Sequence, residues 1–289
     1  MTPVSQLDAA AISGAATAVG AVDAAPPARR GDPRIYQIVT LASLLGYGVF
    51  WLDFEVQAAM AVAILATALM TQLACTWLTG GDRFDPRSAL ISALSLCLLL
   101  RTGSLGLAML TAVLAIASKF VVRVRDKHIF NPTNGALVAM MLVTGEVWVS
   151  PGQWGSGLVF AFLLAAAGGL VVNRAARADV TLTFLACWAG LLVARSLWLG
   201  EPLAIPVHRL QNGALVLFAF FMISDPKTTP DSCAGRLLFA ALVALGAYAV
   251  QFTLFRTNGL LWSLAVCSLA VPAIDRLLPG RPYQWRSSP

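Results

Sequence analysis

Long apolar stretches alternate with short polar ones along most of the chain. A helix needs roughly 20 apolar residues to cross the hydrocarbon layer of a membrane. Seven of the stretches reach that length or come close to it, and three are shorter. The pattern predicts ten helical segments, at residues 35–53, 57–79, 88–101, 105–122, 132–147, 157–174, 179–199, 211–224, 235–254 and 258–277.

The three shorter segments are 88–101, 132–147 and 211–224. Their length is typical of half-helices, or of helices that are interrupted near the middle of the membrane.

Composition supports a membrane protein. Hydrophobic residues make up 58% of the chain and charged residues 12%, with a mean hydropathy of +0.76. A soluble domain carries about 25% charged residues. We predict an all-α polytopic membrane protein that is surrounded by lipid. Its net charge of +6 does not indicate a nucleic-acid partner, because the basic residues follow the loops between segments.

The loops predict the orientation. If residues 1–33 lie in the cytoplasm, fifteen Lys and Arg residues fall on that side and four on the other. Basic residues concentrate on the cytoplasmic side of membrane proteins, so both termini are expected there. Residues 1–33 lack the apolar core of a signal peptide and are interpreted as a disordered cytoplasmic tail. Residues 34–279 form the transmembrane domain, and 280–289 a second cytoplasmic tail.

A weak internal repeat divides the membrane domain. The stretch NPTNGALVAMM at 131–141 matches RTNGLLWSLAV at 256–266, with the Thr-Asn-Gly triplet recurring after 124 residues. The halves are then 35–155 and 157–279, each with five segments. An odd number of crossings inverts the second half relative to the first, an architecture that recurs in transporters.

Two polar clusters adjoin the short segments. In the first, Asn131 can cap a helix that starts at Pro132, and the positive end of that helix can face an anion. A simple helix cap at the membrane surface is the alternative. The second cluster, 224–229, contains Asp225 and Lys227, and either forms a turn or lines a pocket for a ribityl chain, a phosphate or an ion.

Lys119 is a charged residue close to the end of segment 105–122. It can snorkel to the membrane surface or take part in function. The five cysteines show no metal-binding or disulfide spacing, so no metal site is predicted. No motif of a soluble enzyme is present in the sequence, and no catalytic residue is predicted.

Three stretches carry a resemblance to a known family: HIFNPTNGALVAMM, VSPGQWGSG and FFMISDPKTTP. They resemble the membrane subunits of the NqrB/RnfD type, which are shared by the sodium-pumping NADH:quinone oxidoreductase and the Rnf electron transport complex. Residues 35–279 are most similar to a stand-alone RnfD-like branch that is often labelled as enediyne-biosynthesis membrane proteins. The pair FNPTN and SDPKTTP, in this order, is the most specific feature.

The resemblance implies ten helices in two inverted five-helix repeats, similar to urea transporters. It implies a multi-pass protein of a bacterial-type inner (plasma) membrane that binds flavin and passes electrons to redox partner proteins or other subunits. Such a chain is at most a redox-relay subunit of an oxidoreductase.

The family attaches one FMN through its phosphate to a threonine of an S/T-G-A-T motif on the outer side. The nearest approximation here is SGAAT at 13–17, which has an extra alanine and lies in the cytoplasmic tail. The outward stretch SPGQWGSG contains Ser150 and Ser156 but no Ala-Thr pair. We therefore expect FMN or riboflavin to be held without a covalent bond.

The predicted function is a membrane electron-transfer subunit with a flavin between the two halves. The candidate polar contacts of that flavin are Asn131, Thr133, Asn134, Asp225, Lys227, Thr228 and Thr229. A channel or transporter for a small neutral or cationic solute is the main alternative, and a scaffold that has lost both roles is the third.

Overall fold

The computed structural model describes residues 32–51, 54, 56–80, 84–125, 127–150, 168, 169, 172 and 177–283. The predicted tail at 1–33 lies almost entirely outside the described residues, as do the SGAAT stretch and most of the segment 157–174. The stretch SPGQWGSG is described only at Ser150. All elements below belong to one compact unit, Pro33–Pro289.

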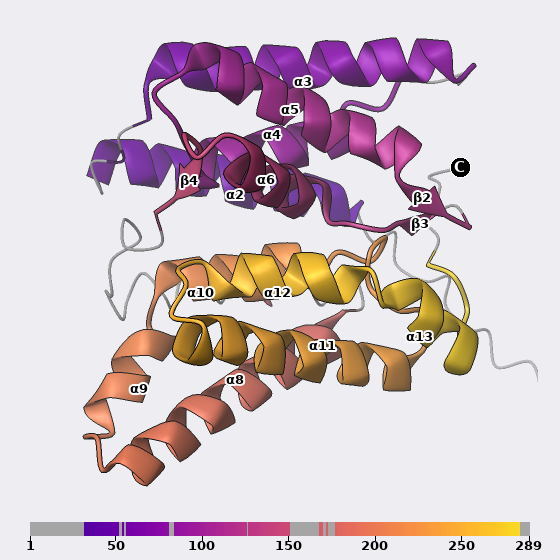
Figure 1. Ribbon diagram of the computed structural model, residues 1–289. Helices are drawn as coiled ribbons and strands as arrows, with labels where there is room; N and C mark the ends of the chain where they lie inside the picture. Colours follow the sequence, from indigo (N-terminus) through magenta and orange to yellow (C-terminus); the bar gives the residue numbers. More distant parts are fainter. Residues whose placement is uncertain are drawn as a thin grey trace, which may run out of the picture. The chain divides into compact units, whose positions relative to one another are not determined.

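Helices dominate the compact unit (Figure 1). The first half contains α2 (Pro33–Trp51), α3 (Ala58–Leu78), α4 (Arg87–Leu99), α5 (Leu105–Val121) and α6 (Pro132–Val143). The second half contains α8 (Ala178–Leu199), α9 (Ala204–Leu210), α10 (Gly213–Leu217), the π-helical turn η2 (Phe218–Met222), α11 (Cys233–Tyr248), the π-helical turn η3 (Ala249–Thr253), α12 (Gly259–Ser268) and α13 (Val271–Leu277).

Two short antiparallel ladders close the ends of the first-half helices. Strand β1 (Leu100–Arg101) directly follows α4 and pairs with β4 (Trp148–Val149), which follows α6. Strand β2 (Arg123–Val124) pairs with β3 (Lys127–His128) in a hairpin between α5 and α6. The ladders bind backbone groups that would otherwise be unsatisfied where the helices end.

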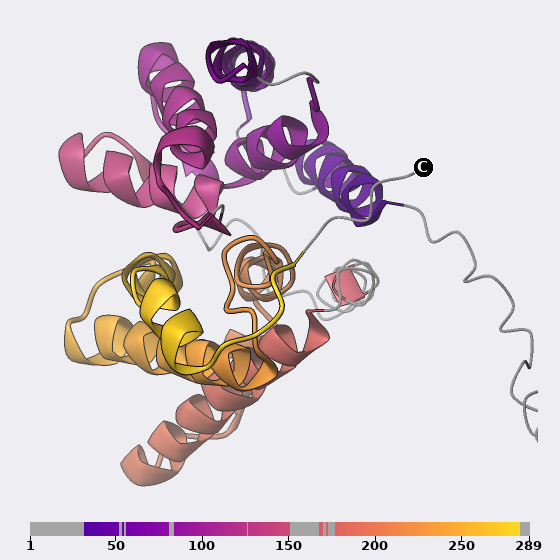
Figure 2. The ribbon, with the colours of Figure 1, turned by 90° about the vertical axis from the view of Figure 1, so that its right-hand side faces the viewer.

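Each half packs in the same order. In the first half α3 packs against α5, and α5 against α6; in the second half α8 packs against α11, and α11 against α12. The halves meet where α6 packs against α12, and Figures 1 and 2 show these two short helices facing one another.

Among the residues that the structure describes, three helices are long and apolar enough to cross a membrane: Ala58–Leu78, Ala178–Leu199 and Cys233–Thr253. The pair α12 and α13 bends by 51° and can form a fourth span. The protein is therefore an all-α, multi-pass membrane protein, as predicted. Every predicted segment that falls on described residues coincides with a helix, whereas a total of ten crossings stays a prediction.

The surface has the character that lipid requires. Trp77, Trp198 and Phe255 are 80–84% exposed, and many leucine and valine side chains also face outward. Buried polar side chains lie inside the helix packing, among them Lys119, Asn131 and Asn134. This distribution is the reverse of a soluble domain, in which charged residues are almost never buried.

The contact of α11 with the start of α12 requires a glycine at position 259. A Cβ atom added to Gly259 would lie 2.8 Å from the backbone oxygen of Ala247. Backbone atoms cannot move aside as a side chain can, so any larger residue separates the two helices. Small residues allow such close approach between membrane helices.

We predict that Gly259→Ala lowers the melting temperature of the detergent-solubilised protein, because overpacking costs about 1–3 kcal/mol. The control is Gly190→Ala on α8, where an added Cβ meets nothing within 4 Å. That variant should match the wild type or exceed it, since alanine favours helix over glycine. Equal melting temperatures for both variants would contradict the close approach.

Candidate functional site

The first polar cluster caps α6 as its sequence predicts. The side chain of Asn131 accepts a hydrogen bond from the Asn134 N–H at 3.1 Å, and Pro132 occupies the first turn. The amide nitrogen of Asn131 lies 3.4 Å from the Met222 carbonyl oxygen and 3.4 Å from a carboxylate oxygen of Asp225. The two predicted clusters therefore meet across the halves.

A second link joins the halves nearby. The ammonium group of Lys127 in β3 donates to Asp231 at 3.1 Å, to Asp275 at 2.7 Å and to the Thr229 carbonyl at 2.7 Å. All three charged side chains are 11–16% exposed. One lysine of the first half thus neutralises two carboxylates of the second half.

A cavity of about 130 Å³ lies beside the Asn131–Asp225 contact. We call it the polar cavity. Four of the seven predicted residues line it: Asn131, Thr133, Asp225 and Lys227. The sequence did not point to several other polar groups at its wall, among them His128, Ser88, Ser92 and Ser95.

The remaining three predicted residues point elsewhere. Asn134 donates to the Leu261 carbonyl at 3.2 Å in the contact between α6 and α12. Thr229 accepts from the Arg177 guanidinium at 3.2 Å, and Thr228 donates to the Asp225 carbonyl. The contacts of Thr228 and Thr229 hold the loop that contains Asp225 in place. The assignment of the seven residues to a flavin stays a prediction.

Lys119 also lines the polar cavity, and it does not snorkel. Its side chain is 5% exposed, and its ammonium group donates to the Ser88 carbonyl at 2.8 Å and the Ser88 hydroxyl at 3.0 Å. Burial raises the pKa of Asp225, while the Lys227 N–H and the Lys119 charge act in the opposite direction. The cavity therefore combines a buried cation and a half-buried carboxyl group.

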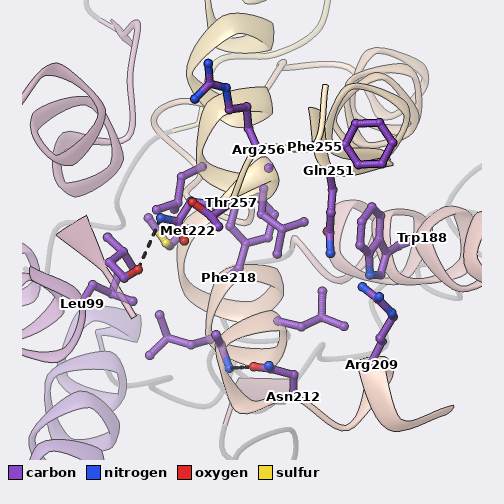
Figure 3. A pocket seen from close by; sticks show the side chains of 18 residues that line it. Leu99, Trp188, Arg209, Asn212, Phe218, Met222, Gln251, Phe255, Arg256 and Thr257 are labelled. Atoms are coloured by element: carbon purple, nitrogen blue, oxygen red, sulfur yellow. Dashed lines mark hydrogen bonds between the residues drawn. The ribbon is translucent and has the colours of Figure 1, made fainter. Parts of the chain in front are cut away.

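A larger cavity of about 450 Å³ is lined by residues of α10, η2, η3 and the start of α12. Its wall includes Trp188, Phe218, Phe255, Arg209, Gln251 and Arg256, drawn in Figure 3, and we call it the aromatic pocket. Leu99 and Val149 are contributed by the first half and the other lining residues by the second. Met222 borders both this pocket and the polar cavity.

Aromatic contacts extend from the wall of the aromatic pocket. The rings of Trp188 and Phe184 are stacked with their centroids 6.4 Å apart, and the ring centroids of Phe184 and Phe218 are 5.1 Å apart. Trp188 also lies 6.5 Å from Phe252 of η3. Rings held on several sides keep a fixed position, which suits the binding of a flat ligand.

Similarity to known proteins identifies the family of the chain. The model of the NQR2, RnfD, RnfE family matches residues 139–284, about half of the chain. The chain belongs to this family. The matched residues include most of the aromatic pocket and the Asp225 loop, while the FNPTN stretch lies just before them.

Three relatives illustrate the match, and each is named as the D component of an ion-translocating oxidoreductase complex. The protein of Escherichia coli O1:K1 / APEC is 35% identical over 136 residues. Those of Escherichia coli strain K12 / DH10B and Shigella boydii serotype 18 are 34% identical over the same length. The aligned part covers 46% of this chain but only 38% of each relative.

Most of the aromatic pocket of this NQR2, RnfD, RnfE family member was not predicted. The one signal that pointed to it is the repeated Thr-Asn-Gly triplet, since Thr257 and Asn258 line the pocket. Of their counterparts, Thr133 lines the polar cavity and Asn134 does not. Asn258 donates to the Val149 carbonyl at 3.3 Å across the halves.

His128 gives a pH-dependent prediction. Burial, aided by the charges of Lys119, Arg123 and Lys227, lowers its pKa from 6.5 to about 4. Between these values the unfolded chain binds a proton that the folded chain does not, so the free energy of unfolding falls as the pH falls. In the His128→Gln variant, the melting temperature should therefore fall less between about pH 6.5 and about pH 4 than it does in the wild type.

The control for this experiment is His208→Gln, at an exposed position on α9. It should retain the pH profile of the wild type. A His128→Gln profile as steep as that of the wild type would show that other groups cause the acid sensitivity.

Proposed function

We propose that this family member is a membrane electron-transfer subunit that binds a flavin non-covalently and works within a larger oxidoreductase. The family match and the names of the relatives support this proposal. They favour it over the solute channel. The proposed partners are other subunits or separate redox proteins that supply and accept electrons.

The aromatic pocket is the proposed position of the flavin ring. Its volume of about 450 Å³ lies within the range of roughly 300–1,000 Å³ that is typical of small-molecule pockets. The polar cavity, at about 130 Å³, is below that range. The observation that carries the proposal is therefore a pocket of ligand size with indole and phenyl rings at its wall, in a chain of this family.

The protein would supply the position and the potential of the flavin. Trp188 and Phe218 present rings to a planar ligand, while Gln251 and Asn258 place hydrogen-bonding groups at the wall. Such contacts and nearby charges tune the potential of a bound redox group, whose chemistry is its own. In this proposal the residues of the polar cavity lie on the far side of Met222 from the ring.

We also propose that the two halves are inverted repeats, with α3 equivalent to α8, α5 to α11 and α6 to α12. Exchanged contacts support this equivalence. Asn131 at the start of α6 reaches the end of η2, and Asn258 at the start of α12 reaches β4, which pairs with β1 at the end of α4. Short helices that meet at the interface of inverted repeats place binding sites there.

With ten crossings and both termini in the cytoplasm, the polar cavity would face the cytoplasm. The aromatic pocket would then open toward the opposite side. A flavin there would be positioned to exchange electrons with a partner on the outer face.

We predict that Trp188→Phe weakens flavin binding about two- to tenfold and raises the fluorescence of the bound flavin. Loss of an aromatic contact costs about 0.5–1.5 kcal/mol, and the electron-rich indole that quenches the flavin is removed. Titration of the detergent-purified protein with riboflavin measures both effects.

Trp198→Phe is the matched control, because Trp198 is on the same helix but 84% exposed and outside the pocket. It should bind flavin as the wild type does. Equal effects of the two substitutions would place the flavin elsewhere.

A further inference from the structure

The last described residues of the chain follow α13 and have no regular secondary structure. Helix α13 ends at Leu277, and residues 279–283, with the sequence PGRPY, extend from it. Figure 2 shows this stretch leaving α13 and running from the second half of the chain toward the first. We call residues 279–283 the strap.

The strap approaches the loop before α11 more closely than a side chain allows. A Cβ atom added to Gly280 would lie 2.5 Å from the carbonyl carbon of Asp231 and 2.7 Å from the Cα atom of Ser232. Glycine permits such close approach of two backbones. Pro279 and Pro282 restrict the backbone on either side, so the strap loses less conformational freedom when it lies in this position.

Two cations hold the end of the strap. The ammonium group of Lys227 donates to the carbonyl oxygen of Tyr283 at 3.3 Å. The guanidinium carbon of Arg177 lies 4.9 Å from the centroid of the Tyr283 ring, which is a cation–π contact. Arg177 also donates to the hydroxyl of Thr229. The strap is therefore tied to the loop that contains Asp225.

The strap lies against two wall residues of the polar cavity. Lys227 is the first, since it lines the cavity and reaches the strap with its ammonium group. His128 is the second, because it lines both the polar cavity and a neighbouring pocket of about 190 Å³. The lining of that pocket includes Pro279, Gly280 and Pro282 of the strap. His128 thus stands between the polar cavity and the pocket that the strap helps to enclose.

We propose that the strap is a lid, which limits the access of water-soluble molecules to the polar cavity and opens when its contacts with Lys227 and Arg177 are released. A hydrogen bond and a cation–π contact each stabilise a position only modestly, so the strap can open while the helices stay folded. In the orientation proposed above, the strap lies on the cytoplasmic side. The inference does not depend on a bound flavin.

The experiment measures how fast a thiol inside the polar cavity reacts. Ser95→Cys supplies the thiol, because Ser95 lines the cavity and is 6% exposed. The exposed Cys233 is first replaced by serine. The full-length protein, purified in detergent, is treated with 2-sulfonatoethyl methanethiosulfonate, a small anionic thiol reagent. Mass spectrometry then gives the rate of modification at position 95.

Two substitutions in the strap should raise this rate, since a group that reacts only in the open form reports the open fraction. Tyr283→Leu removes the ring from Arg177 without a change of charge and should accelerate the reaction about two- to tenfold. Gly280→Ala places a Cβ atom against the backbone of Asp231 and Ser232 and should accelerate it at least about tenfold.

Leu277→Ala is the matched control. Leu277 lies just before the strap, is 80% exposed and is outside the lining of both cavities that adjoin His128. This substitution should leave the rate at position 95 unchanged. The native thiol of Cys97 is 2% exposed and lies outside the polar cavity, so its rate reports any loosening of the whole fold.

Faster modification at position 95 with an unchanged rate at Cys97 is the expected result for both strap variants. Rates at position 95 that match the parent protein in both variants would overturn the lid. Equal acceleration at position 95 and at Cys97 would also overturn it, because the substitutions would then act on the fold and not on the strap. The reaction involves no flavin, so neither outcome bears on the proposed function.

Discussion

The architecture depends on polar groups that must find partners inside an apolar surrounding. An unsatisfied polar group in hydrocarbon costs several kcal/mol, so the polar clusters at the ends of the short helices can persist only by meeting each other. Asn131 meets Asp225, and Lys127 meets Asp231 and Asp275. Removal of Lys127 would leave two partly buried carboxylates close together without a cation, which destabilises the contact between the halves. These contacts hold the halves in register.

The cavities follow from the same arrangement. Helices α6 and α12 are short, and a cavity lies at the start of each. At the start of α6 the walls come from the polar clusters, and Lys119 and Asp225 line the same cavity. At the start of α12 the walls include aromatic and apolar residues of α8, η2 and η3. The π-helical turns η2 and η3 contribute to these walls, and such turns are frequent at functional sites.

Sequence patterns predict the helices well where hydrophobic length decides the outcome. They also predict the cap at Asn131, because an asparagine followed by a proline favours the start of a helix whatever the tertiary packing. They did not predict α9, the π-helical turns or the wall of the aromatic pocket. Trp188, Gln251 and Phe252 belong to long apolar helices, and only tertiary packing decides that they face a pocket and not lipid. The sequence likewise does not predict the burial of Lys119, since its partner Ser88 lies on another helix, 31 residues earlier in the chain.

The central claim is a flavin held without a covalent bond, and acid precipitation of the purified protein tests it most directly. The account predicts flavin absorption bands in the native protein that pass into the supernatant when the protein precipitates. Bands that remain with the pellet would show a covalent attachment and contradict the account. The absence of flavin bands from a pure, folded sample that also fails to take up added FMN would contradict the electron-transfer role itself.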